Sequence, residues 1–161
     1  MPDLRAVVIT VSDRCARGEQ EDESGSVLVA ALREAGATIF AKAVVSDDLK
    51  PLTKLMRDFC DRSDINLIVT TGGTGLAPRD NTPEATKALI QREVPGISEA
   101  IRAAGILSNP HAMLSRGLCG IYNDTLIVNL PGSPAAVRES FAVIAPVLPH
   151  AIRLIMGDTK H

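Results

Sequence analysis

The sequence predicts an α/β fold with a mostly parallel central sheet, because strand-like and helix-like segments alternate along the chain. Three segments rich in β-branched and apolar residues, 4–11, 38–45 and 65–71, are each followed by apolar residues at helical spacing or by a loop that leads to them. This alternation is typical of parallel strands joined by crossover helices. The 161 residues, 45% of them hydrophobic, suit one domain over residues 1–161 with a buried core.

The first strand is expected over residues 4–11, where an uninterrupted apolar run indicates that helices cover both faces. It ends at Ser12 and Asp13, which favour a turn. From Ser24 the apolar residues recur at helical spacing, and Gly36 stands where a helix commonly stops. A strand, a turn and a helix therefore open the chain.

A second strand is expected over residues 38–45, and the Ser-Asp-Asp segment 46–48 interrupts it. Residues 51–60 then place apolar side chains on one helical face. Either Asp47 or Asp48 is suited to cap this helix. The third strand follows and leads directly into a loop rich in glycine.

Two further helices are expected after that loop. Thr82 is a suitable N-cap and Pro83 a suitable first helical residue for one of them. Residues 94–105 restart a helical pattern at a Pro-Gly pair, and the segment 109–117 is less regular.

The C-terminal part predicts a β-hairpin and then helices. Segments 118–122 and 125–130 have the composition of strands and flank an Asn-Asp pair that suits a two-residue turn. Residues 131–157 supply one or two helices, with a break expected at Pro146 or Pro149. The last four residues, DTKH, are expected to fray.

Composition argues against a nucleic-acid-binding or membrane protein. The formal net charge is -2, with 17 basic and 19 acidic residues spread along the chain, so no basic surface is indicated. Aromatic residues make up 2% and Trp is absent, which removes the stacking surfaces of single-strand binders. No uninterrupted apolar run reaches the roughly 18 residues of a membrane span, and the first residues do not resemble a signal peptide. We therefore expect a cytoplasmic protein.

The cysteines and histidines form no recognisable catalytic or metal-binding motif. Cys15, Cys60 and Cys119 are odd in number and widely spaced, which is typical of reduced thiols rather than of disulfides or a zinc site. None of the three histidines is paired in sequence with a serine or cysteine nucleophile. Catalysis through a protein nucleophile is not indicated.

Candidate ligand-binding residues lie in the loops that follow the strands. Ligands of open α/β sheets bind beyond the carboxyl ends of the strands, and four loops leave those ends: residues 12–13, 46–48, 71–80 and 129–134. Glycines within residues 72–75 suit a phosphate-binding loop, because glycine lets successive N–H groups turn toward an anion. A tight turn without a ligand is the alternative, and the length of the connection favours a functional loop.

Asp47 and Asp80 are the carboxylates that stand out. Each follows a predicted strand end, so both are expected to reach one crevice beside the glycine-rich loop. Carboxylates near phosphates are the usual protein ligands of Mg²⁺. The alternatives are helix capping for Asp47, and a turn or an ion pair with Arg79 for Asp80.

Hydroxyl groups offer further contacts. Ser133 follows a Pro-Gly turn and precedes a helix, so its hydroxyl either caps that helix or meets an anion at the helix N-terminus. Ser12 and Asp13 offer a hydroxyl and a carboxylate to a sugar or a pterin-like ring, with a plain turn as the alternative.

Five segments carry longer motifs: TVSDRCARGEQEDESG, TTGGTGLAPRDNTPEAT, PGISEAIR, MLSRGLCGI and NLPGSPAAVRES. Together, and in this order between Arg5 and Leu154, they resemble the molybdopterin adenylyltransferase family, which includes the MogA-type enzymes and the G domain of gephyrin. The resemblance implies a three-layer α/β sandwich, usually a homotrimer. It also implies transfer of AMP from Mg²⁺-ATP to the phosphate of molybdopterin, with later hand-over of the product to a molybdate-insertion protein.

The resemblance assigns catalysis and magnesium binding to Asp47 and Asp80. Ser46 stands where many members have proline and Asp48 where they have glutamate, so Asp48 is an alternative to Asp47. Whether ATP or the pterin occupies the glycine-rich loop stays open, and a non-catalytic binding or scaffold protein of the same fold is the alternative function. The substrate-contacting residues implied by the family motifs are Ser12, Asp13, Thr71, Gly72, Gly73, Thr74, Gly75, Pro131, Gly132 and Ser133.

Overall fold

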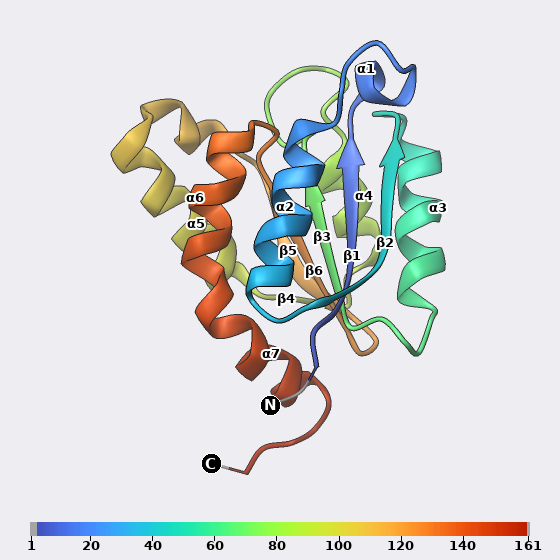
Figure 1. Ribbon diagram of the computed structural model, residues 1–161, viewed down its shortest axis with the longest axis vertical. Coiled ribbons are helices and arrows are strands. Elements are labelled where there is room, and N and C mark those ends of the chain that lie inside the picture. The colour runs from blue at the N-terminus through green and yellow to red at the C-terminus, as the bar shows by residue number, and fades with distance from the viewer. Residues whose placement is uncertain (1–2, 161) are drawn as a thin grey trace.

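A six-stranded sheet forms the centre of the computed structural model, which describes residues 3–160 (Figure 1). The strand order is β2-β1-β3-β6-β5-β4. The first four strands of this order run parallel, and β5 and β4 are antiparallel to their neighbours. The expected mostly parallel sheet with a hairpin is therefore confirmed. The strands are β1 (Arg5–Val11), β2 (Thr38–Val45), β3 (Leu67–Thr71), β4 (Arg92–Glu93), β5 (Cys119–Tyr122) and β6 (Thr125–Leu130).

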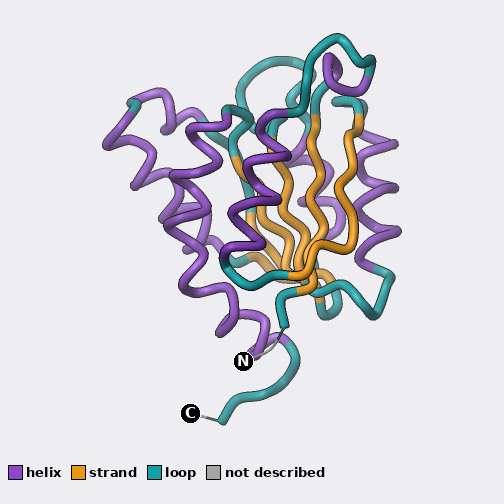
Figure 2. The backbone as a smooth tube through the Cα atoms, viewed as in Figure 1, coloured by secondary structure: helices purple, strands orange, loops and turns teal. Residues whose placement is uncertain are grey.

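Helices cover both faces of the sheet and make three layers (Figure 2). One face carries α2, α5, α6 and α7, and the other carries α3 and α4. The helices are α1 (Asp13–Ala16), α2 (Glu23–Glu34), α3 (Leu49–Cys60), α4 (Thr82–Leu89), α5 (Pro95–Ser108), α6 (Pro134–Ile144) and α7 (Leu148–Ile155), with 3₁₀ turns η1 (Pro110–Leu114) and η2 (Ala145–Val147).

The core consists of two apolar clusters separated by the sheet. Successive side chains of a strand point to opposite faces, so Val8 of β1 packs with α2 and α6 while Val7 and Ile9 pack with α3 and α4. All three of these side chains have no exposed surface. Burial on both faces explains why the parallel strands are continuous apolar runs rather than alternating ones.

The carboxyl ends of the four parallel strands lie level with one another. Thr10 of β1 is paired with Thr71 of β3, and Thr71 is in turn paired with Leu130 of β6. At the edge of the sheet Val11 is paired with Val45 of β2. The four loops expected to bind ligands therefore leave one edge of the sheet, at the top of Figure 1.

Several local predictions differ from the structure. Thr82 is the first residue of α4 rather than its cap, because its hydroxyl donates to the carbonyl of Gly72, 2.9 Å away. Helix α5 continues past Gly105 to Ser108. Strand β4 was not expected from the sequence, and it forms through pairing with β5. The C-terminal break falls at η2, which contains Pro146, and His161 of the tail lies outside the described residues.

The segment Pro134–Ile155 is long and apolar enough to cross a membrane by length and composition. Its buried residues belong to the core cluster on one face of the sheet. Among them are Val137, Phe141 and Ile152, each at most 4% exposed. The segment is thus a pair of core helices, α6 and α7, joined by η2.

Candidate functional site

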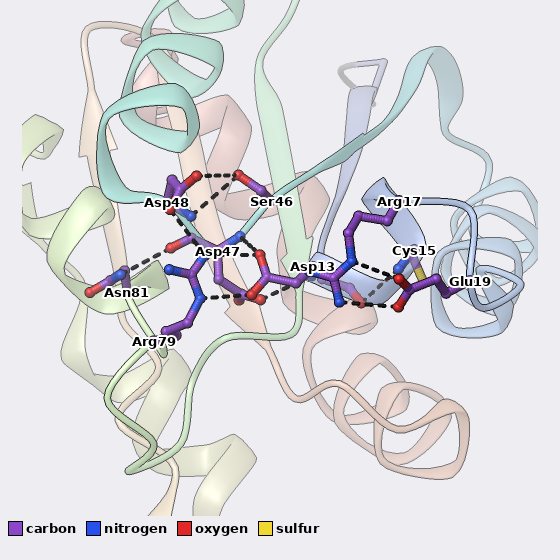
Figure 3. Close-up of polar contacts among 10 residues, drawn as sticks. Asp13, Cys15, Arg17, Glu19, Ser46, Asp47, Asp48, Arg79 and Asn81 are labelled. Atoms are coloured by element: carbon purple, nitrogen blue, oxygen red, sulfur yellow. Dashed lines mark hydrogen bonds and ion pairs between the residues drawn. The ribbon is translucent and has the colours of Figure 1, made fainter.

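The carboxylates of Asp13 and Asp47 lie together where β1 and β2 end (Figure 3). The main-chain N–H of Asp13 donates to Oδ2 of Asp47 at 3.0 Å, and the N–H of Asp47 donates to Oδ1 of Asp13 at 3.0 Å. Asn81 adds a third link, because its side-chain amide donates to the carbonyl of Asp47 at 2.9 Å. The ends of two neighbouring strands and the start of α4 are joined at this point.

Arg79 lies in the glycine-rich loop after β3 and binds residues of the two loops that follow β1 and β2 (Figure 3). Its Nε and Nη2 donate to the two carboxylate oxygens of Asp13 at 2.7 and 3.0 Å. Nη2 also donates to Asp48 at 3.0 Å. The alternative of an Arg79–Asp80 ion pair is not realised, since Arg79 pairs with Asp13 and Asp48 instead.

These contacts move the pKa values of neighbouring carboxyl groups in opposite directions. The hydrogen bonds from Arg79 lower the pKa of Asp13 to about 2, helped by the hydrogen bond from the main chain of Asp47. Burial raises the pKa of Asp47, and the nearby charges of Asp13 and Asp80 act in the same direction. The Asp47 carboxylate is therefore the less stabilised of the pair in its charged form.

The glycine loop, residues 72–81, runs from β3 to α4 and contains two glycines in conformations that favour glycine. Gly72 has φ of 98° and Gly73 has φ of 68°. A Cβ at Gly72 would lie 2.4 Å from the carbonyl oxygen of Val11, and one at Gly73 would lie 3.3 Å from Oδ1 of Asp47. The glycines therefore let the loop pass against β1 and bring it beside the Asp47 carboxylate.

Three successive N–H groups of this loop have no protein partner among the described residues. Within residues 3–160, the N–H groups of Gly73, Thr74 and Gly75 donate to no protein acceptor. By contrast, the N–H of Gly72 donates to the carbonyl of Leu130 at 3.2 Å. Consecutive unpaired N–H groups in a glycine-rich turn are the arrangement that binds phosphate oxygens.

Asp80 lies at the far end of the glycine loop. Its Oδ2 accepts the N–H of Ala77 at 3.0 Å, so the expected turn is present. Its charge contributes to the raised pKa of Asp47, which places the two carboxylates within electrostatic range. Gly75 faces the same carboxylate, because a Cβ there would lie 2.9 Å from Oδ2 of Asp80. The structure thus places Asp80 against Gly75 and within electrostatic range of Asp47.

The serines of the other two loops act as helix caps. Oγ of Ser12 accepts the N–H of Cys15 at 3.2 Å, and Oγ of Ser133 accepts the N–H of Ala136 at 3.2 Å. Asp48 holds the N-cap position of α3 but forms no capping hydrogen bond. Capping by Asp47, the alternative to a ligand role, is not realised, because its carboxylate accepts from Asp13.

Two hollows flank the glycine loop and the Pro-Gly-Ser turn. One of about 330 Å³ is bordered by Thr74, Gly75, Pro131 and Ser133 together with residues of α5, η1 and α6. The other, of about 220 Å³, is bordered by Ser12, Thr71, Gly72 and Gly132 together with the acidic segment that begins α2. Gly72 and Gly132 both border the second hollow and pack against each other, since a Cβ at Gly132 would be 3.3 Å from Cα of Gly72. The remaining predicted residues, Asp13, Asp47, Gly73 and Asp80, border neither hollow; Asp13 and Gly73 lie next to Asp47, and Asp80 is within electrostatic range of it.

Asp47 and Asp80 each keep one carboxylate oxygen without a protein donor among the described residues. Within the described chain, Oδ1 of Asp47 and Oδ1 of Asp80 accept no hydrogen bond, while the Oδ2 atoms are held by main-chain N–H groups. Across residues 3–160 there is no cluster of three or more His, Cys, Asp or Glu side chains able to hold a metal. Two fixed carboxylates suit Mg²⁺, which is usually bound by one or two carboxylates with substrate phosphates and waters.

Sequence reasoning missed two residues of this site. Arg79 was considered only as a partner of Asp80, and Asn81 was not considered. Their contacts join residues 66 and 34 positions apart in the chain, so no local pattern marks them. The only available signal was the position of both in the loop after β3.

Comparison with known proteins gives consistent matches over nearly the whole chain. A family model described as "Probable molybdopterin binding domain" matches residues 7–150. A molybdopterin adenylyltransferase of Helicobacter pylori strain J99 is 39% identical over 160 residues, covering 98% of this chain and 91% of that protein. The crystal structure of the molybdopterin biosynthesis enzyme MoaB from Thermus thermophilus superposes with a TM-score of 0.90 at 45% identity, covering 96% of this chain and 97% of the other.

A further relative is much longer. The molybdenum cofactor synthesis protein cinnamon of Drosophila melanogaster is 45% identical over 154 residues, which is 95% of this chain. The chain spans 26% of that protein. The likeness to cinnamon therefore concerns one part of a larger protein.

Proposed function

The chain belongs to the family of molybdopterin-binding domains, and from this premise we propose that it is a molybdopterin adenylyltransferase. The reaction is the transfer of AMP from Mg²⁺-ATP to the phosphate of molybdopterin. Its support is the Helicobacter pylori relative of that name, which matches 98% of the chain. A role in molybdenum cofactor biosynthesis agrees with the other relatives.

The proposed chemistry needs no protein nucleophile. A phosphate oxygen of molybdopterin attacks the α-phosphorus of ATP and forms a new P–O bond. The bond from the α-phosphorus to the bridging oxygen breaks, and pyrophosphate leaves with its electron pair. Because two polyanions must meet, neutralising and aligning their charges supplies most of the catalysis.

One observation carries the proposal: the loop with the unpaired N–H groups of residues 73–75 approaches the Asp47 carboxylate at Gly73 and borders two hollows. The N–H groups would hold phosphate oxygens at the junction of the two hollows. Each hollow would then receive the organic part of one substrate. This arrangement suits a reaction that joins two phosphate-bearing molecules.

Asp47 and Asp80 are the residues that would hold Mg²⁺, each through the Oδ1 atom that no described N–H occupies. Bound Mg²⁺ would offset the negative charge of the triphosphate and of the departing pyrophosphate. Asp13 keeps Asp47 in place through the exchanged main-chain hydrogen bonds. Arg79 offsets the charge of Asp13 by direct hydrogen bonds, whereas burial disfavours the charged form of Asp47.

Incubation of the purified protein with molybdopterin, ATP and Mg²⁺ tests the proposal directly. The expected products are adenylylated molybdopterin and pyrophosphate in equal amounts, separated by chromatography. Omission of molybdopterin is the control for simple ATP hydrolysis. Molybdopterin binding without either product would reject the transferase and leave the binding or scaffold protein of the same fold.

Further properties proposed from the family concern assembly and location. We expect residues 1–161 to act as one domain that forms a homotrimer in the cytoplasm and passes its product to a molybdate-insertion protein. Sedimentation should then give about three times the chain mass of 17.0 kDa. A stable monomer would contradict the trimer.

A further inference from the structure

Arg116 lies outside the glycine loop in sequence but binds it at three positions. Its main-chain N–H donates to the carbonyl of Thr74 at 2.8 Å. Its side-chain Nε donates to the carbonyl of Gly75 at 2.8 Å, and Nη2 donates to the carbonyl of Asp80 at 2.8 Å. One residue therefore contacts the loop on both sides of its exposed tip, residues 76–79.

Arg116 is itself held by two helices. Its Nη1 pairs with Glu84 of α4. On the other side, Nη1 of Arg102 in α5 donates to the carbonyls of Ser115 and Gly117 at 3.3 and 3.0 Å. The main chain around Arg116 is thus fixed to α5, and the guanidinium is fixed to α4.

Other contacts anchor the ends of the loop and Arg79, but among the described residues only Arg116 binds the main chain of both Gly75 and Asp80. The described hydrogen bonds within it join Ala77 to Asp80 at the tip, through the N–H of each. The side chains of residues 76–79 are exposed. Gly75 and Asp80 approach closely, because a Cβ at Gly75 would lie 2.9 Å from Oδ2 of Asp80. The distance between the unpaired N–H groups and the Asp80 carboxylate thus depends on how these two residues are held.

The side chain of Arg116 is suited to hold the carbonyls of Gly75 and Asp80. Its guanidinium is planar and presents donors at fixed angles, so Nε and Nη2 hold two carbonyls at a set separation. A lysine ammonium has one nitrogen and does not reproduce that geometry. Neither contact uses a carboxylate or N–H group that the proposed reaction needs.

We propose that Arg116 is a positioning residue for AMP transfer, which sets the spacing between the phosphate-binding N–H groups of residues 73–75 and the carboxylate of Asp80. It acts through the loop backbone and contacts none of the reacting atoms. The effect of Arg116 on AMP transfer rests on the proposed function, whereas its effect on the geometry of the glycine loop does not.

The test compares Arg116→Lys with Glu84→Gln in the full chain. Glu84→Gln removes the charge of the pair but keeps an amide oxygen that accepts from Nη1, so the guanidinium stays bound to α4 and keeps its contacts to loop carbonyls. For Arg116→Lys we expect kcat to fall by about 10- to 100-fold, since small misplacements of aligned groups cost this much. The Mg²⁺ concentration for half-maximal rate should rise, while Glu84→Gln should stay within about twofold of the wild type in both measurements.

Hydrogen exchange tests whether Arg116 holds the loop, whether or not the protein transfers AMP. In Arg116→Lys the hydrogen-bonded amides of Ala77, Asp80 and position 116 should exchange at least about tenfold faster, while those of β1 keep their protection. Unchanged loop exchange, or unchanged kcat and Mg²⁺ dependence in an active protein, would overturn the proposal. If the wild type transfers no AMP, the proposed function fails, and loop exchange alone then decides whether Arg116 holds the loop.

Discussion

Asp13 and Asp47 each donate a main-chain N–H to the carboxylate of the other, at 3.0 Å in both directions (Figure 3). The exchange joins the ends of β1 and β2 and holds two acidic side chains next to each other. Arg79 donates hydrogen bonds to Asp13 and lowers the pKa of that carboxyl group to about 2, while burial raises the pKa of Asp47. Adjacent groups whose pKa values are moved apart are typical of functional sites.

Asp47→Asn should remove AMP transfer and stabilise the fold. The amide oxygen still accepts the N–H of Asp13, but the negative charge is lost, and we expect the rate to fall by at least about 100-fold. Because burial raises the pKa of Asp47, its charged carboxylate destabilises the folded state at pH values above that pKa. This destabilisation disappears as the pH falls and the group is protonated. At neutral pH the variant should therefore melt higher, by about 1–3 °C, in a thermal scan.

Asp58→Asn is the matched control for Asp47→Asn. Asp58 is an exposed carboxylate of α3 whose partner is Lys54, one turn away. The same change of charge there should leave the rate within about twofold of the wild type and the melting temperature nearly unchanged. Equal losses of rate in both variants would attribute the effect to net charge and remove Asp47 from the magnesium site.

Asp80→Ala and Asp80→Asn separate the charge of Asp80 from its structural hydrogen bond. Both variants lose the charge, but only Asn keeps an oxygen that accepts the N–H of Ala77. If Asp80 binds Mg²⁺, both should lose AMP transfer by at least about 100-fold, with thermal stability close to that of the wild type. The rates come from pyrophosphate release at saturating substrates. An Asp80→Asn variant of normal rate would assign Asp80 a purely structural role in the loop.

Arg79→Met should make the stability of the protein less sensitive to acid. Asp13 has its pKa lowered from 3.8 to about 2 by the hydrogen bonds of Arg79. A lowered acid pKa stabilises the fold above the ordinary value, and this contribution disappears as pH falls from about 4 to 2. Urea unfolding at pH values between about 5 and 2.5 should show the wild type more stable at the upper end and the two proteins converging below. A constant difference across this range would exclude Asp13 as the titrating group.

The fold was predictable where burial leaves a strong local pattern. The strand ending at Val11 and the one ending at Thr71 are covered on both faces, so their sequences are continuous apolar runs with clear ends. Strand β4 has two exposed charged residues and exists only because it pairs with β5, so no local pattern predicts it. Thr82 has the right residue type for a cap, but a carbonyl ten residues earlier takes its hydroxyl.

The candidate site was predictable in its positions but not in its contacts. The rule that ligands bind beyond the carboxyl ends of parallel strands located Asp47 and the glycine loop, since the register places those ends at one edge. The hydrogen bonds of Arg79 and Arg116 depend on how distant segments meet. Arg79 reaches Asp13 across 66 positions, and Arg116 reaches Gly75 across 41. Local patterns in one sequence carry no information about which distant segments come into contact.

The two glycines at positions 72 and 36 allow a test of why the loop needs glycine. Both have positive φ, 98° and 87°, so alanine is strained at either position. A Cβ at Gly36 has nothing within 4 Å, whereas a Cβ at Gly72 would lie 2.4 Å from the main-chain oxygen of Val11. Gly36→Ala should therefore cost about 1 kcal/mol of unfolding free energy, the penalty of the backbone conformation alone.

Gly72→Ala should cost more, roughly 2–4 kcal/mol, because backbone strain and a steric clash with β1 add. Val11 is the last residue of its strand and Asp13 follows two positions later, so the clash displaces the loop or the strand end that carries the carboxylate pair. Urea unfolding of both variants measures the difference, and added inorganic phosphate should stabilise the wild type and Gly36→Ala but not Gly72→Ala. Equal costs for the two substitutions would mean that the contact between the glycine loop and β1 relaxes freely, and that the position of Gly72 against Val11 does not require glycine.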